Sequence, residues 1–136
     1  MRYGVLHDIA QKLVAQEPID LTMDHVNVIW QGDANDCALR ALAHCTAPTS
    51  GLNVSGPAVR IRDLAEGLGQ HLGLAPVFVG HEAPTAWLVN ITQAQRLFGE
   101  PSVTMPTLLD LTADWVARGL GSLSKPTHCD ARDGRY

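Results

Sequence analysis

The stretch VRIRDLAEGLGQHLG, residues 59–73, contains three glycines, Gly67, Gly69 and Gly73. Glycines this dense are typical of a loop that lets a nucleotide phosphate approach the backbone. Such a turn needs its glycines between the end of a strand and the start of a helix. Apolar residues, however, recur through the stretch at steps of three and four: Val59, Ile61, Leu64, Leu68 and Leu72. This spacing predicts an amphipathic helix that ends at Gly73, and it argues against a dinucleotide turn.

Strand patterns and helical patterns alternate on both sides of this helix. Residues 5–16 carry a helical stripe, which Glu17-Pro18 ends because the residue before proline avoids the helical region. Short runs rich in apolar and β-branched residues predict strands at 19–23, 26–30, 52–54 and 76–79. The chain is therefore expected to be a small α/β lobe in which short strands alternate with helices.

Three further helices are expected from their end signals. Asp33 is the predicted N-cap of one, which places Ala38, Ala41, Leu42 and Cys45 on a single face. Asn90 or Thr92 caps a second helix, which runs through Phe98. A third begins near Pro106, runs to Arg118 and is ended by Gly119, and the tail from 124 to 136 is expected to be irregular.

Composition limits the classes of protein to which the chain can belong. Its 136 residues suit one domain, and 46% hydrophobic against 18% charged residues argues against disorder. A net charge of −4 without a basic block gives nucleic-acid binding little electrostatic support. No apolar run has the length of a membrane span, and His7 and Asp8 interrupt the start where a signal peptide would be apolar. A cytoplasmic location is the expectation, and three cysteines without a CxxC pair agree with it.

Residues that could carry nucleophilic or metal chemistry are few. His44-Cys45 and His128-Cys129 are adjacent pairs, whose members point in different directions on a helix. A metal-dependent hydrolase built from them and Cys37 remains an alternative, although buried cysteines are often simply small apolar residues. No G-x-S-x-G elbow occurs, and Ser55 is better explained as part of a turn before proline.

The loop after the strand at 76–79 is the predicted position for ligand contacts. His81 and Glu82 follow that strand, and the carboxyl ends of strands are where α/β folds place ligands, although solvated loop residues are also common. Trp30 and Trp87 flank the same region and either line a pocket or pack in the core. Asp33 and Asp36 are explained by helix capping, and Trp115 is assigned to the core on a stripe with Leu108 and Leu111.

The order of these segments resembles the C-terminal part of extended short-chain dehydrogenases/reductases, the NAD(P)-dependent epimerase/dehydratase family. No single motif is specific, but six consecutive segments occur at the family's spacing and together cover nearly the whole chain. They are HVNVIWQGDANDCALRAL, GLNVSGP, VRIRDLAEGLGQHLG, PVFVG, WLVNITQAQRLFGEP and TLLDLTADWV. The resemblance implies a single substrate-binding lobe over residues 1–136.

Two features of the family are missing from this chain. Family members carry an N-terminal Rossmann half with a G-x-x-G-x-x-G turn and a Y-x-x-x-K catalytic pair. Here Tyr3 is followed four residues later by His7, and Tyr136 is the last residue, so neither motif occurs. The resemblance therefore implies no catalytic residue in this chain and no cofactor bound by it alone. NAD or NADP is implied for the complete enzyme.

The resemblance also implies substrate contacts at matching positions. Arg2 and Tyr3 fall near the substrate cleft of family members, and Asn27 falls where epimerases have a polar residue. Gly80, His81 and Glu82 fall where many sugar-nucleotide enzymes place an arginine that grips the diphosphate. That arginine is absent here, which argues against a nucleotide-sugar substrate. The expected substrate-binding residues are therefore Arg2, Tyr3, Asn27, His81, Glu82 and Trp87.

Two functions follow as hypotheses. The first is the substrate-binding portion of an oxidoreductase, which is inactive alone and closes over a small, sugar-related substrate held against a Rossmann half. Without that half it would expose an apolar face and self-associate. The second is a free-standing, non-catalytic module that binds a ligand or a protein. Neither hypothesis includes nucleic acid or a membrane as a partner.

Overall fold

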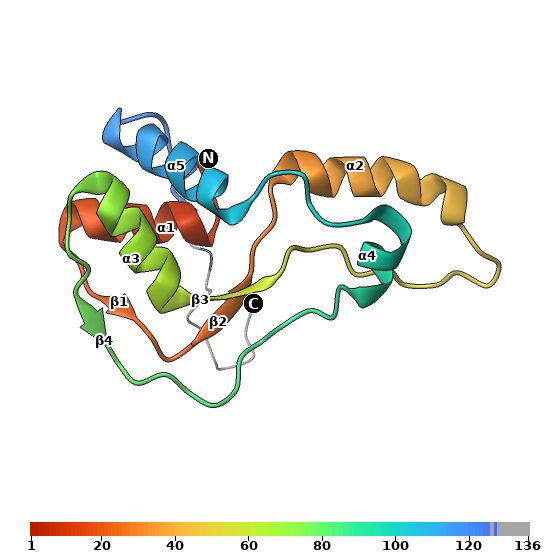
Figure 1. The fold of residues 1–136 in the computed structure, drawn as a ribbon, viewed down its shortest axis with the longest axis horizontal. Helices are drawn as coiled ribbons and strands as arrows, with labels where there is room; N and C mark the ends of the chain where they lie inside the picture. Colours follow the sequence, from red (N-terminus) through yellow and green to blue (C-terminus); the bar gives the residue numbers. More distant parts are fainter. Residues whose placement is uncertain (126, 128–136) are drawn as a thin grey trace.

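The computed structural model describes residues 1–125 and 127, and these residues form an α/β fold of helices and very short strands (Figure 1). The expected fold class is thereby confirmed. In chain order the elements are α1 (Val5–Ala15), β1 (Ile19–Asp20), β2 (His25–Asn27), α2 (Gln31–Ala41), a 3₁₀ turn (Leu42–His44), β3 (Ala58–Arg60), α3 (Ile61–Leu72), β4 (Phe78–Val79), α4 (Thr92–Phe98) and α5 (Met105–Ala117). Within the described part, no helix is both long enough and apolar enough to span a bilayer.

Helices α1, α3 and α5 pack against one another and enclose the core. Leu13, Leu64 and Leu68 are among the most deeply buried side chains. Thr112 is also fully buried, and its hydroxyl donates to the Leu108 carbonyl oxygen at 2.7 Å. Burial of these apolar faces, worth roughly 1.5–3 kcal/mol for a fully buried leucine, is the main stabilising contribution to this part of the chain.

The glycine-rich stretch lies in α3 and at its end, as the apolar spacing predicts. Gly67 and Gly69 are inside the helix, and Gly73 follows it with φ +69°. The Gly73 position closes the helix in the left-handed conformation that favours glycine. At Gly69 a side chain is excluded, because a Cβ atom would lie 2.5 Å from the Leu74 carbonyl oxygen. The glycines thus serve chain reversal and close packing at the end of α3.

Two separate pairs of strands flank the helices. β1 and β4 are parallel, with Ile19 opposite Phe78. β2 and β3 are antiparallel, and their register places His25 opposite Arg60 and Asn27 opposite Ala58. The second pair is directly continuous with α3, so residues at the end of β3 and in the first turn of α3 lie beside the start of β2.

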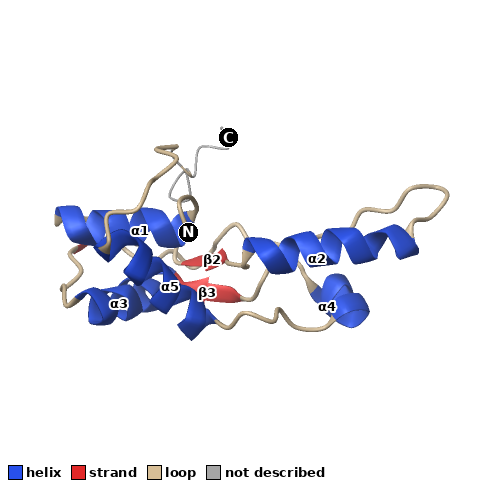
Figure 2. Ribbon diagram, turned by 90° about the horizontal axis from the view of Figure 1, so that it is seen from above, coloured by secondary structure: helices blue, strands red, loops and turns tan. Residues whose placement is uncertain are grey.

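Helices α2 and α4 stand apart from the three packed helices (Figures 1 and 2). Extended segments of chain connect them to the rest of the molecule. None of the residues of α2 is buried, and Leu39 and Leu42 are 70% and 71% exposed. On the expected face of Ala38, Ala41, Leu42 and Cys45, only Ala41 is half-buried and the other three residues are exposed.

Several expected boundaries are wrong. Asp33 lies inside the first turn of α2, and Trp30 occupies the N-cap position. The 52–54 segment forms no strand, while Ala58–Arg60, which lies in the expected helical stretch, is β3. In both places, contacts with distant residues determine the local structure. The Asp33 carboxylate binds the Ser102 hydroxyl and so does not cap the helix, and β3 forms because it pairs with β2.

The last two helices begin close to their expected capping residues. Asn90 Oδ1 accepts from the Thr92 backbone N–H at 3.0 Å and so caps α4 from outside its first turn. The Thr104 hydroxyl accepts from the Thr107 backbone N–H at 3.4 Å, at the start of α5. The core assignment of the α5 stripe holds only in part. Leu108 is buried, Trp115 is half-buried, and Leu111 is 42% exposed.

Candidate functional site

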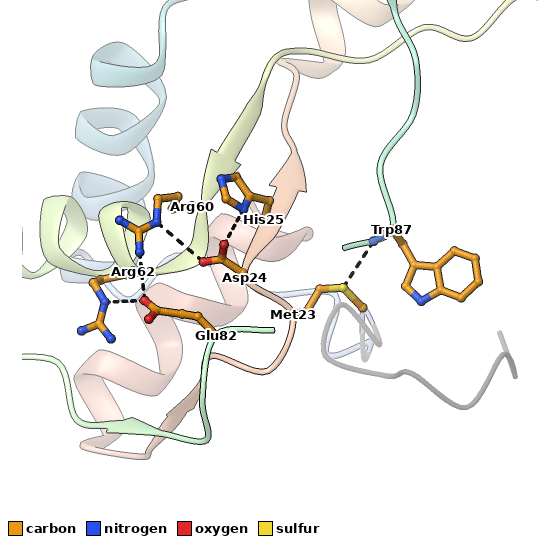
Figure 3. Close-up of polar contacts among 7 residues, drawn as sticks. All are labelled: Met23, Asp24, His25, Arg60, Arg62, Glu82 and Trp87. Carbon is orange, nitrogen blue, oxygen red and sulfur yellow. Dashed lines mark hydrogen bonds and ion pairs between the residues drawn. The ribbon is translucent and has the colours of Figure 1, made fainter. Parts of the chain in front are cut away.

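A group of charged side chains gathers where β2, β3, α3 and the loop after β4 meet (Figure 3). Asp24 and His25 stand at the start of β2, and Arg60 lies opposite them at the end of β3. Arg62 is the second residue of α3. Glu82 reaches the group from the loop that follows β4. Elements distant in sequence thus supply one polar surface.

The turn after β4 directs Glu82 to this place. Gly80 has φ +73°, and a Cβ atom there would lie 2.6 Å from Asp20 Oδ1. Asp20 Oδ1 accepts from the Thr22 backbone N–H at 2.7 Å and from the Thr22 hydroxyl at 2.5 Å. The hydroxyl bond is the main cause that lowers the pKa of Asp20 below its ordinary value. A carboxylate oxygen that accepts two hydrogen bonds therefore packs beside the glycine at which the chain turns.

Two arginines converge on a single oxygen of Glu82. Arg62 Nε donates to Glu82 Oε1 at 2.7 Å, and Arg60 Nη2 donates to the same oxygen at 3.1 Å. The hydrogen bond from Arg62 is the main cause that lowers the pKa of Glu82, and the reciprocal bond raises the pKa of Arg62. The Arg62 guanidinium also lies over the Phe78 ring, 4.6 Å from its centroid. These contacts hold the Arg62 side chain in one orientation.

Asp24 forms the other side of the group. Its Oδ2 lies 2.7 Å from His25 Nδ1, and its Oδ1 lies 3.6 Å from Arg60 Nε. The Asp24 side chain is only 16% exposed, so it depends on these partners for charge compensation. Two guanidinium groups and two carboxylates therefore compensate each other's charge in this group.

The segment from Gly80 to Ile91, here called the strap, crosses the β2–β3 pair without regular secondary structure. Several hydrogen bonds attach it to other parts of the chain, among them one from Asn53 Nδ2 to the Asn90 carbonyl oxygen at 3.4 Å. Glu82 binds the arginines, the Trp87 backbone N–H donates to Met23 Sδ at 3.5 Å, and the Val89 backbone N–H donates to Asn27 Oδ1 at 2.8 Å. Figure 3 shows the Trp87 indole directed away from the charged group, and it is 63% exposed.

Four of the six expected substrate-binding residues belong to this region. His81, Glu82 and Trp87 lie on the strap, and Asn27 anchors the strap while donating from Nδ2 to the Gly56 carbonyl oxygen at 2.9 Å. Their substrate-binding roles stay predictions.

Arg2 and Tyr3 are not brought into the group. Among the described residues no hydrogen bond or ion pair joins either side chain to it. The Arg2 carbonyl oxygen instead accepts from the Leu123 backbone N–H at 2.9 Å, and Tyr3 is 51% exposed. The two residues lie at the N-terminal end of α1, next to the segment that follows α5.

Sequence reasoning missed Asp24, Arg60 and Arg62. The available signal was the pattern Arg-Ile-Arg at 60–62, in which a strand ends and a helix begins. Alternate residues at such a junction can converge because the chain changes from a period of two to a period of 3.6. The apolar spacing of 59–73 alone indicates a helix and gives no sign that the two arginines converge.

Away from the charged group, a hollow with a cavity volume of about 220 Å³ lies between α2, α4 and the segment that follows α4. Asp33 forms one wall, where its carboxylate accepts from the Ser102 hydroxyl at 2.6 Å and from the Val103 backbone N–H at 3.1 Å. The Ser102 bond is the main cause that lowers the pKa of Asp33. Arg40 lies 5.0 Å from the centroid of the Phe98 ring, which joins the two helices.

The hypothesis of a metal site finds no support in the described residues. No three histidine, cysteine, aspartate or glutamate side chains among them come close enough to hold an ion. Cys37 is partly exposed and Cys45 exposed, both as free thiols. The expected pair His128-Cys129 lies outside the described residues, as does most of the tail expected to be irregular.

Comparison with known proteins finds solved structures with a similar fold. No protein-family model and no curated protein matches the chain. Among solved structures, a UDP-galactose 4-epimerase is 26% identical with a TM-score of 0.63, and the match covers 88% of this chain and 42% of the epimerase. The UDP-glucose 4-epimerase of Thermotoga maritima, determined with UDP-glucose, is 17% identical with a TM-score of 0.62, over 85% of this chain and 40% of that one.

A third match is the UDP-glucuronic acid 4-epimerase of Bacillus cereus, determined in complex with NAD. It is 17% identical with a TM-score of 0.63, and the match covers 85% of this chain and 38% of the enzyme. The chain thus has the fold of part of an NAD-dependent epimerase/dehydratase-type protein. It spans about two fifths of the length of the solved structures that it matches.

Proposed function

We propose that this chain is the substrate-binding portion of an NAD(P)-dependent epimerase/dehydratase-type oxidoreductase, and that it works against a Rossmann half that holds the cofactor. The proposal is supported by the likeness to solved UDP-sugar 4-epimerases, about three fifths of whose length has no counterpart here. The substrate would be a small molecule of the sugar class. The Rossmann half would belong either to the same longer protein or to a separate chain.

The described residues do not fit a nicotinamide dinucleotide. The only dense glycine group lies within and at the end of α3, so its backbone faces no helix N-terminus. We therefore expect no hydride transfer by this chain alone, and we assign the cofactor to the other half. The role left to this chain is to bind the substrate and to exclude water from it.

The observation that carries the proposal is the unburied helix α2. A helix of 11 residues is marginal in water unless one of its faces packs against something. Leu39 of α2 and Leu42 of the following 3₁₀ turn are among the most exposed large apolar side chains of the described part. Exposed apolar faces of this kind mark interaction surfaces. We assign this face to the contact with the Rossmann half.

The neighbouring segment Leu52–Val54 supports the same assignment. It is extended, and within the described residues its backbone N–H and C=O groups make no hydrogen bond. The strand expected at this position would form if a sheet edge on the partner supplied the missing ladder. A parallel Rossmann-type sheet offers such an edge, and its faces are normally covered by helices such as α2. The Rossmann half would thus both cover the exposed side of α2 and form hydrogen bonds with the segment Leu52–Val54.

The first test determines the mass of the natural product in cell extract, with an antibody raised against residues 125–136. We expect a product at least about twice the 14.6 kDa of this chain, as the coverage of the epimerases implies. A product of 14.6 kDa that remains a stable monomer would instead favour the free-standing module.

The second test examines the α2 face directly. The isolated chain is expected to self-associate in sedimentation velocity, and the double variant Leu39→Glu/Leu42→Glu is expected to be monomeric with unchanged thermal unfolding. Val14→Glu, an equivalent change at an exposed residue of α1, serves as the control and should self-associate like the parent chain. A monomeric parent, or equal dispersal by the control, would contradict the assignment of this face.

A free-standing, non-catalytic binding module is the second candidate, and the 220 Å³ cavity between α2 and α4 favours it. Its walls combine charged groups with apolar ones, as ligand pockets do. This candidate predicts a monomeric chain in the sedimentation experiment. The two functions are therefore separated by the same measurement.

A further inference from the structure

We propose that Arg60 and Arg62 form a binding site for a phosphate group, and that the Glu82 carboxylate occupies this site in the structure described here. The ligand class is inorganic phosphate or the phosphate group of a phosphorylated small molecule. The proposal does not rest on the proposed function, because the residues that form the site all belong to this chain.

The convergence of two guanidinium groups on one oxygen is the first support. Arg62 Nε and Arg60 Nη2 lie 2.7 Å and 3.1 Å from Glu82 Oε1. Arg60 is the last residue of β3 and Arg62 is the second residue of α3, so both side chains leave the chain at the same junction. Guanidinium groups arranged in this way recognise carboxylate and phosphate by the same hydrogen-bond geometry.

Glu82 uses only part of the donor capacity of the pair. Each arginine has five N–H donors. In the described residues, Nη1 and Nη2 of Arg62 and Nη1 of Arg60 have no hydrogen-bond or ion-pair partner. A phosphate group carries more acceptor oxygens and more charge than a carboxylate, and it can therefore engage more of these donors.

The start of α3 adds to the attraction for an anion. Arg60 stands at the N-cap position, and no side chain caps this helix of 12 residues. The N-terminal backbone N–H groups of a helix carry partial positive charge. The carboxylates of Asp24, Asp63 and Glu66 lie nearby and oppose this charge, so selectivity for phosphate would come from donor geometry and not from a strong positive field.

The site is open to solvent, and its present occupant is displaceable. The side chains of Arg60, Arg62 and Glu82 are 44%, 33% and 31% exposed. Glu82 belongs to the strap, which has no regular secondary structure. A phosphate that displaces Glu82 would loosen the strap, so ligand binding and strap movement are coupled.

The test is isothermal titration of the intact chain with inorganic phosphate at constant ionic strength, with chloride as the balancing anion. We expect saturable binding that becomes about tenfold tighter in Glu82→Gln, because the competing carboxylate is removed, and that is lost in Arg62→Gln. Glu17→Gln removes one negative charge from an exposed residue elsewhere and should leave the affinity unchanged.

Arg60→Gln provides a second arginine variant, in case loss of the Arg62 contact with Phe78 disturbs the fold. Circular dichroism establishes which variants are folded. The proposal is overturned if folded Glu82→Gln shows no saturable phosphate binding, or if the folded arginine variants bind phosphate as tightly as the parent. Neither measurement needs a Rossmann half, so failure here is distinguishable from failure of the proposed function.

Discussion

Arg62 Nε lies 2.7 Å from Glu82 Oε1, although the two residues are 20 positions apart in the sequence. The contact attaches the strap to the first turn of α3. It also determines the protonation behaviour of Glu82, because the hydrogen bond from Arg62 is the main cause that lowers the pKa of this carboxyl. Fold and site are therefore linked by one ion pair.

The pH dependence of this link is the first prediction. Since the pKa of Glu82 in the folded chain lies below its ordinary value of 4.5, the attachment contributes fully above pH 4.5 and is lost as the pH falls through the lower value. A carboxyl ¹³C NMR titration should show a Glu82 midpoint below 4.5 that rises in Arg62→Gln. Arg118→Gln, which removes an exposed guanidinium elsewhere, should not move it. A midpoint at or above 4.5 in the parent would refute the attachment.

Asn27 should stabilise the chain through both the oxygen and the nitrogen of its side-chain amide. It accepts from Val89 N–H and donates to the Gly56 carbonyl oxygen. Asn27→Ala should therefore lower the free energy of unfolding by about 1–2 kcal/mol, as measured by urea denaturation. Asn35→Ala removes only an exposed contact with Gln31 and should change it by less than about 0.5 kcal/mol. Equal effects of the two substitutions would contradict the anchoring role of Asn27.

Three glycines provide a graded test of the end of α3. Gly73→Ala should cost about 1 kcal/mol, because φ +69° strains a residue with a Cβ atom although the surrounding space is open. Gly69→Ala should cost about 1–3 kcal/mol, because its Cβ would lie 2.5 Å from the Leu74 carbonyl oxygen. Gly121→Ala, with neither constraint, should be within about 0.5 kcal/mol of the parent. Thermal unfolding followed by circular dichroism gives the order, and a stabilised Gly69→Ala would disprove the packing argument.

Substitutions of Asp33 and Asp36 are expected to differ in their effect on stability, although both residues lie near the start of α2. Asp33→Ala loses the bonds from Ser102 and Val103 and should lower the free energy of unfolding by about 1–2 kcal/mol. Asp36→Ala loses only an exposed pair with Arg40, worth less than about 0.5 kcal/mol. The pKa of Asp33 is lowered in the fold, so the difference between the variants should shrink as the pH falls below 3.8. Denaturant titrations at pH 7 and pH 3 would measure it, and a constant difference would contradict the role of the ionised form.

Local patterns were sufficient for most helices. The apolar steps of 59–73 predicted α3 and its end at Gly73, and the capping signals near Thr92 and Pro106 predicted α4 and α5 within a few residues. Such elements follow from interactions between residues three or four apart, which a single sequence displays directly. The interpretation of the glycines as helix interior and helix end, and not as a cofactor turn, was confirmed for the same reason.

Strands and the charged group required information that local patterns lack. The segment 52–54 has strand composition but no partner in the described residues, whereas Ala58–Arg60 is a strand because β2 lies beside it. In the same way, the role of Glu82 depends on two arginines about 20 residues earlier, and nothing in its own neighbourhood announces them. Hydrogen bonds between distant segments are a property of the folded chain.

The sequence by itself therefore determined the α/β class, the helices that enclose the core, and the helical nature of the glycine-rich stretch, because each of these depends on local periodicity. Only the tertiary structure decided which strands pair, that no residue of α2 is buried, and that Arg60, Arg62 and Glu82 meet. Those outcomes depend on the distance between segments that the chain brings together only after it folds, and burial and charge pairing act at that stage.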